Sequence, residues 1–73
     1  MGSNGYFMVK DSYIDRHGNS LYKMRIEFPW KYKGLYELWR IDPSGSTLEV
    51  AWDFAEYPDN IDPLAYEYYT FYR

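Results

Sequence analysis

Hydrophobic and polar positions alternate most regularly between residues 22 and 28. Every second residue there is apolar or aromatic and the residues between are charged: Tyr22, Met24, Ile26 and Phe28 against Lys23, Arg25 and Glu27. A period of two places the two sets on opposite faces of an extended chain, which predicts a half-buried strand. Pro29 ends this strand, and the PWKYKG stretch that follows predicts a loop closing on Gly34.

Two further strand-like segments flank a turn signal at residues 42–45. Residues 35–41 are rich in apolar and aromatic side chains, and residues 48–54 alternate between large apolar and small or acidic side chains. The Asp-Pro-Ser-Gly stretch between them has Pro where a type I turn fixes φ, and Gly where a following bulge needs positive φ. We therefore predict a β-hairpin over residues 35–54.

The two ends of the chain complete the pattern. Residues 6–14 are rich in aromatic and β-branched side chains and predict a first strand, which the turn-forming stretch DRHGNS ends. Residues 64–73, LAYEYYTFYR, allow two interpretations. Asp62 as a cap and Pro63 as the first residue suit a helix, whereas the density of Tyr, Phe and Thr favours a strand. Five rings in ten residues exceed what so small a core can hold, so we expect at least two to be exposed.

These elements predict a mainly β protein with one small domain over residues 6–73, preceded by a flexible leader at residues 1–5. The preferred architecture is an antiparallel five-stranded meander or partly open barrel. The alternative is a four-stranded antiparallel sheet with a C-terminal helix. A chain of 73 residues buries only about 60% of the surface that its unfolded form exposes, so its core is small.

Composition adds a strong aromatic bias and an uneven charge. Aromatic residues make up 23% of the chain, and cysteine is absent. The net charge of −3 divides into +3 for residues 1–41 and −6 for residues 42–73. No apolar run approaches the roughly 20 residues of a membrane span, so we expect a soluble, cytoplasmic protein with no membrane contact.

Catalytic chemistry finds little support in the sequence. The single histidine, His17, stands in a turn, and no serine or cysteine has the oriented base that a nucleophile needs. The carboxylates Asp53, Glu56, Asp59 and Asp62 are dense, but their polar surroundings favour a solvated acidic face over an acid–base pair or a Ca²⁺ loop. We expect no enzyme activity, no catalytic residues, no metal site and no cofactor.

A nucleic-acid-binding small barrel is one alternative function. Cations that could contact phosphates lie beside rings that could stack on bases. The candidate residues are Lys23, Arg25, Trp30, Lys31, Tyr32 and Lys33. The acidic C-terminal half would repel the same polyanion, which makes this hypothesis secondary.

The aromatic surplus points instead to protein binding, because Tyr and Trp are the residues that most often anchor interfaces. The candidate partner-binding residues are Trp30, Tyr32, Tyr66, Tyr69 and Tyr72. Our leading hypothesis is a non-catalytic protein-binding module, such as an inhibitor or accessory subunit of a larger protein. The partner would be another protein or a second copy of the chain, and a designed chain with no biological partner is a further alternative.

Overall fold

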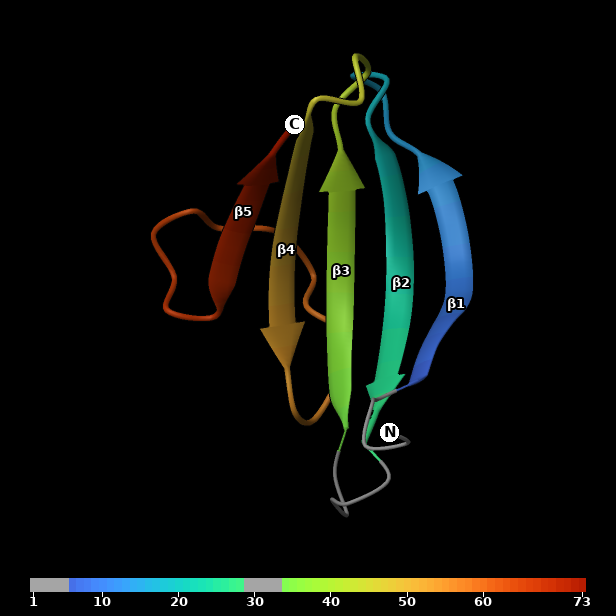
Figure 1. Cartoon of the computed structure of the whole chain (residues 1–73), viewed down its shortest axis with the longest axis vertical. Coiled ribbons are helices and arrows are strands. Elements are labelled where there is room, and N and C mark those ends of the chain that lie inside the picture. The colour runs from blue at the N-terminus through green and yellow to red at the C-terminus, as the bar shows by residue number, and fades with distance from the viewer. Residues whose placement is uncertain (1–5, 29–33) are drawn as a thin grey trace.

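The structure, a computed structural model, describes residues 6–28 and 34–73. Within them, five strands form one open antiparallel sheet whose strand order follows the sequence (Figure 1). The strands are β1 Tyr6–Ile14, β2 Ser20–Glu27, β3 Leu35–Ile41, β4 Thr47–Asp53 and β5 Tyr68–Tyr72. The predicted mainly β meander is confirmed, with β1 and β5 at the two opposite edges of an open sheet. The leader and residues 29–33 of the predicted loop lie outside the described residues.

The C-terminal segment is a strand rather than a helix. Tyr68–Tyr72 pairs antiparallel with residues 47–51 of β4. Residues 64–67 belong instead to the segment that joins β4 to β5, residues 54–67, which we call the connector. The described residues contain no helix at all, and hence none that is long and apolar enough to cross a membrane.

Two similar turns close the β1–β2 and β3–β4 hairpins at the same end of the sheet. In each, a glycine N–H donates to the carbonyl of an aspartate three residues earlier, Gly18 to Asp15 at 3.1 Å and Gly45 to Asp42 at 2.9 Å. Both glycines have positive φ, 85° and 76°, as a bulge after a type I turn requires. Each aspartate carboxylate also accepts hydrogen bonds from backbone N–H groups of its own turn.

The strand register divides the side chains between two faces of the sheet. One face holds seventeen side chains in four rows: Ile14, Ser20, Ile41, Leu48 and Phe71; Ser12, Tyr22, Trp39, Val50 and Tyr69; Val9, Met24, Glu37 and Trp52; and Phe7, Ile26 and Leu35. We call this the aromatic face, and Glu37 is its one charged member. The opposite face, the connector face, carries charges throughout: Asp11, Lys23, Arg25, Arg40, Glu49 and Asp53.

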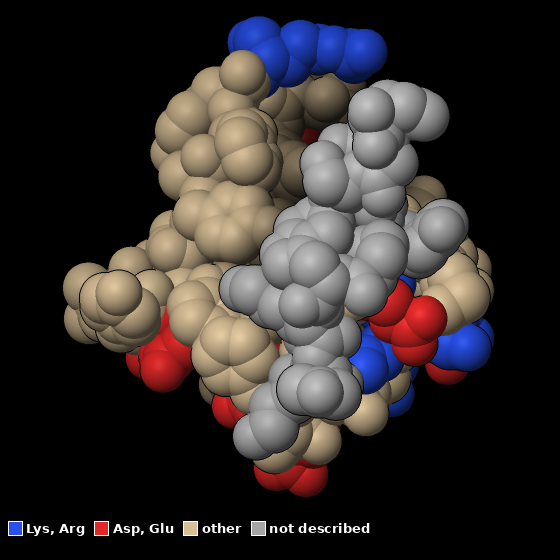
Figure 2. All heavy atoms as spheres, turned by 60° about the horizontal axis from the view of Figure 1, so that its bottom comes forward, with Lys and Arg blue, Asp and Glu red and all other residues tan. Residues whose placement is uncertain are grey.

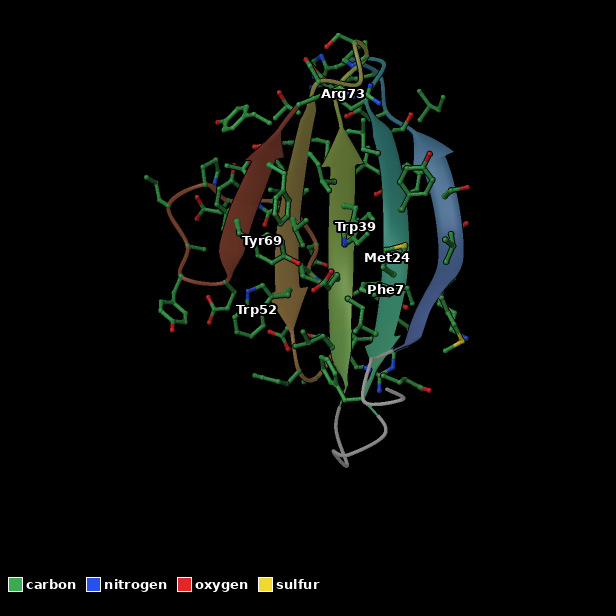
Figure 3. The ribbon with its side chains drawn as sticks, in the orientation of Figure 1. Phe7, Met24, Trp39, Trp52, Tyr69 and Arg73 are labelled. Atoms are coloured by element: carbon green, nitrogen blue, oxygen red, sulfur yellow. The ribbon has the colours of Figure 1, made fainter. Side chains whose placement is uncertain are left out.

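The connector covers the middle of the face named after it. Ile61 of the connector packs on Leu21, Leu38 and Ala51, and all four are buried. In Figure 1 the connector passes behind the sheet, whereas Figure 3 shows Phe7, Met24, Trp39, Trp52 and Tyr69, one from each strand, on the near side. The two faces therefore present different surfaces, one partly covered by its own chain and one made almost entirely of apolar side chains.

Candidate binding surfaces

A buried carboxylate lies at the centre of the aromatic face. Glu37 is only 2% exposed. Its Oε1 accepts a hydrogen bond of 2.6 Å from Nε1 of Trp39, and its Oε2 accepts one of 3.1 Å from the hydroxyl of Tyr69. Trp39 stands two residues further along β3 on the same face, and Tyr69 reaches over from β5. Both carboxylate oxygens are thus occupied and out of reach of a substrate.

The electrostatics of this cluster hold Tyr69 in its neutral, donating form. Burial raises the pKa of the Tyr69 hydroxyl well above its ordinary value, and the nearby Glu37 charge and its hydrogen bond raise that pKa further. In the described part of the chain no cation pairs with Glu37. A buried charge held only by neutral donors is costly unless those donors are well placed. Moving either the Trp39 or the Tyr69 side chain would leave one oxygen of the Glu37 carboxylate without a donor, so Glu37 holds both in position.

A second carboxylate on the connector face binds the neighbouring tyrosine of β5. The hydroxyl of Tyr68 donates to Oε2 of Glu49 at 2.9 Å, while Arg40 pairs with Oε1 of Glu49 at 2.7 Å. Consecutive tyrosines of β5 therefore donate to carboxylates on opposite faces of the sheet. Glu49 differs from Glu37 in having a cation partner and in being partly exposed to water.

Large rings pack edge to face across the aromatic face. Phe7 meets Trp39 at 6.3 Å between ring centroids, and Tyr69 meets Phe71 at 5.3 Å, within the range in which such pairs attract. Val50 is fully buried between Trp39 and Tyr69 in its row. The outer positions on β1 and β5 remain accessible, with Ile14 at 70% and Phe71 at 56% exposure.

Aromatic and backbone contacts tie the connector to the sheet. The Tyr57 ring packs edge to face on Tyr36 at 5.0 Å. Two cations of β2 lie over these rings, with Lys23 Nζ 5.8 Å from the Tyr57 centroid and the Arg25 guanidinium 4.3 Å from that of Tyr36. At its far end the connector accepts a backbone hydrogen bond at Glu67 from the N–H of Trp52. These contacts hold the connector in a defined position over the connector face.

The outer side of the connector combines exposed apolar side chains with acidic ones. Leu64 is 94% and Tyr66 is 88% exposed, and a turn in which Ala65 donates to the Asp62 carbonyl presents them. We define the connector surface as these two residues with the exposed carboxylates of the same segment: Glu56, Asp59, Asp62, Leu64, Tyr66 and Glu67. Residues 41–72 contain no Lys, Arg or His. Figure 2 shows acidic side chains spread over the lower half of the view, the connector side of the sheet.

A depression of about 280 Å³ adjoins the connector surface where the connector meets β4. Its lining includes Asp53, Asp62 and Glu67 beside Trp52. A cationic side chain of a partner would find opposite charge there.

Of the five residues predicted to bind a partner, the three that the structure describes, Tyr66, Tyr69 and Tyr72, do not share one surface. Tyr66 and Tyr72 are exposed, on the connector and near the end of β5. Tyr69, which we expected among the exposed rings, is half-buried on the aromatic face because Glu37 draws its hydroxyl inward. Trp30 and Tyr32 lie outside the described residues.

The residues of the nucleic-acid alternative are only partly described. Lys23 and Arg25 lie on the connector face, over Tyr57 and Tyr36. Arg25 Nη1 is buried and has no hydrogen-bond partner among the residues that the structure describes, so this side chain is directed into the molecule rather than towards a phosphate. Lys31 and Lys33, with Trp30 and Tyr32, lie outside the described residues.

Two functional features were missed by sequence reasoning. Glu37 was counted only as a charge, although it stands between Leu35 and Trp39 on the face that alternation makes apolar. Leu64 was considered only as part of a strand or helix, and the acidic residues around it only as a solvated face. The absence of any cation from residues 41–72 was a signal that could have drawn attention to the connector.

Comparisons with known proteins return nothing: no family model matches the chain, and neither the curated proteins nor the solved structures contain a significant match. Function must therefore be inferred from the two surfaces themselves, the connector surface and the aromatic face.

Proposed function

We propose that the chain is a non-catalytic protein-binding module whose connector surface docks on a basic patch of a larger protein. The observation that carries this proposal is the placement of Leu64 and Tyr66, 94% and 88% exposed, among four carboxylates in a segment without cations. A role as an inhibitor or accessory subunit fits such a surface.

The apolar and the charged side chains of the connector surface would contribute in different ways, as they do at many protein interfaces. Apolar and aromatic side chains that become fully desolvated supply most of the affinity. The carboxylates around them steer association and reject acidic surfaces, and their effect is screened by salt. Ile61 and Tyr57 hold the connector against the sheet, so little ordering cost falls on the binding step.

The test begins by cross-linking the tagged chain to its partners in a cell extract and purifying any protein captured. That protein is then titrated by calorimetry with the wild-type chain and with a Leu64→Ser/Tyr66→Ala variant. We expect at least about a 30-fold loss of affinity, the scale of interface hot spots. Tyr13→Ala is the matched control, because Tyr13 is an exposed tyrosine on β1 outside the connector.

A second variant separates charge from apolar contact. Glu56→Gln/Asp59→Asn should slow association and flatten the salt dependence, while leaving dissociation nearly unchanged. Equal affinity of the wild type and the Leu64→Ser/Tyr66→Ala variant would overturn the proposal. Affinity that is the same at low and high salt would overturn the basic character of the partner site.

A further inference from the structure

We propose that the aromatic face is covered by the aromatic face of a second copy of this chain, giving a dimer of two sheets packed face to face. This inference does not depend on the proposed function, because the connector surface lies on the other side of the sheet and would stay accessible in the dimer.

The described chain places a second layer on only one face of the sheet. Domains bury the apolar face of a sheet against a second layer. Here the described chain supplies such a layer, the connector, only to the face that carries charges. On the opposite face Glu37 is the one charged side chain among seventeen, and Phe7, Ile14 and Phe71 remain exposed at its margins.

The size of the face sets how large the dimer interface can be. Strands about 4.8 Å apart, with side chains repeating every 6.8 Å on one face, give each position about 33 Å². The seventeen positions then span about 550 Å² in projection. Four of the seventeen, Met24, Ile26, Glu37 and Val50, are already buried within the chain, so a second copy would cover mainly the others, among which Phe7, Val9, Ile14 and Phe71 are 56–70% exposed. Twice the projected area lies near the lower end of the range for specific complexes, about 1,200 Å² in total.

Charge favours a second copy as the occupant. Two identical surfaces repel when they present like charges, but the carboxylate of Glu37 is 2% exposed and held beneath Trp39 and Tyr69. A face-to-face pair with two-fold symmetry also closes on itself and leaves no such face uncovered. A short chain without a disulfide gains from association the stability that a small core lacks.

The β1 edge of the sheet is less suited to self-association. β1 is the longer edge strand, but its register shifts between Val9 and Asp11, which leaves Lys10 as the extra residue of a bulge. Bulges and lysines are the features with which edge strands block pairing to another strand.

The row at the turn end of the face offers a complementary fit. Ile14, Ser20, Ile41, Leu48 and Phe71 form that row. A depression of about 240 Å³ lies at its β5 end, lined in part by Ile41, Leu48 and Phe71. This volume exceeds that of the apolar cavity, about 150 Å³, that binds benzene in another protein, so the depression has room for an aliphatic side chain. With the two-fold axis along the strands, β1 of one copy lies over β5 of the other, and Ile14 faces this depression.

Light scattering after gel filtration, across a dilution series, tests the dimer. We expect twice the chain mass of 8.9 kDa for the wild type. Ile14→Lys and Phe71→Lys change exposed positions on the aromatic face, so each should fold and raise the dimer dissociation constant at least about 30-fold. Tyr13→Lys is the control, because Tyr13 adjoins Ile14 on β1 but belongs to the other face. It should leave the dimer intact.

Circular dichroism checks that each variant folds. A wild type that stays monomeric at millimolar concentration overturns the proposal. So does a dimer that both aromatic-face variants leave intact. Equal disruption by Tyr13→Lys and Ile14→Lys also overturns it and assigns association to the β1 edge.

A measurement on the wild type alone covers the case in which the variants do not fold. NMR relaxation by a soluble gadolinium complex is compared between concentrated and dilute samples. Dilution should increase relaxation of the aromatic-face side chains, such as Val9 and Phe71, and leave that of Leu64 unchanged. An increase confined to the connector would overturn the proposal.

Discussion

The hydroxyl of Tyr69 donates a hydrogen bond of 3.1 Å to Oε2 of Glu37, thirty-two residues earlier in the chain. This contact joins the edge strand β5 to the central strand β3 over the intervening strand β4. Tyr68, the preceding residue, makes the corresponding contact with Glu49 on the other face. β5 is therefore anchored by two carboxylates on opposite faces of the sheet, and within residues 6–28 and 34–73 only Glu49 has a cation partner.

Removing the Tyr69 hydroxyl should destabilise the protein. Tyr69→Phe leaves one oxygen of a buried carboxylate without a donor, a loss of about 1–3 kcal/mol in the free energy of unfolding. Urea denaturation followed by circular dichroism measures it. The matched control is Tyr68→Phe, which should cost less because Glu49 retains Arg40 and contact with water. An equal or larger effect of Tyr68→Phe would contradict the role assigned to the burial of Glu37.

A double-mutant cycle should show that Glu37 and Tyr69 act together. Glu37→Met removes the buried charge but leaves the Tyr69 hydroxyl and the Trp39 N–H without an acceptor. Adding Tyr69→Phe removes one of those stranded donors, so the double variant should lose less stability than the sum of the single ones. We expect a coupling free energy of about 0.5–3 kcal/mol, measured by urea denaturation. Strict additivity would mean that the hydrogen bond contributes nothing.

The raised pKa of Tyr69 predicts a loss of stability at alkaline pH. A tyrosine whose pKa is higher in the folded state keeps its proton there while the unfolded chain releases its own, near the ordinary value of 10.0. The contribution of Tyr69 to the free energy of unfolding should be constant below that pH and fall as the pH rises above it. Urea midpoints from pH 8 to 11 measure this. Tyr69→Phe should reduce the slope, and Tyr72→Phe, at an exposed ring, should not.

The turn aspartates predict the opposite behaviour in acid. Hydrogen bonds from Ser44 and from backbone N–H groups lower the pKa of Asp42 below its ordinary 3.8. Its contribution is present above that pH and is lost as the pH falls through the lower folded value. Asp42→Ala should therefore lower the urea midpoint at pH 7, and the difference from the wild type should shrink below pH 3.8. Asp59→Ala, in the exposed connector, should have no comparable effect.

Most of the strand content follows from local sequence patterns. Alternation at residues 22–28 and the turn residues around Gly45 depend on neighbours a few positions apart, and the corresponding strands and turn are present. The position of the Tyr69 side chain depends on a contact between distant parts of the sequence, because its hydroxyl donates to the carboxylate of Glu37, thirty-two residues away. Tyr69 was predicted to bind a partner, which requires an exposed ring, but a hydroxyl with a buried acceptor can lie inward.

The path of the connector is a second feature that the sequence does not predict. Its composition of Pro, Asp and Asn correctly predicts an irregular segment. Composition cannot say which face of the sheet the segment crosses, since that is decided by where Ile61 finds apolar neighbours among Leu21, Leu38 and Ala51. Those neighbours come from three different strands. The division into an aromatic face and a connector face therefore emerges only once the strands are in register.

The strictly sequential strand order also bears on how the chain folds. Each strand pairs only with its neighbours along the chain, so only short connections have to close before β1, β2, β3 and β4 can pair. The exception is β5, which reaches β4 only after the fourteen-residue connector closes. The connector must close, at a cost in chain entropy, before β5 can pair with β4. The β1–β4 meander is therefore expected to form first. The docking of β5, with its two tyrosines, would be the final step and the first to reverse.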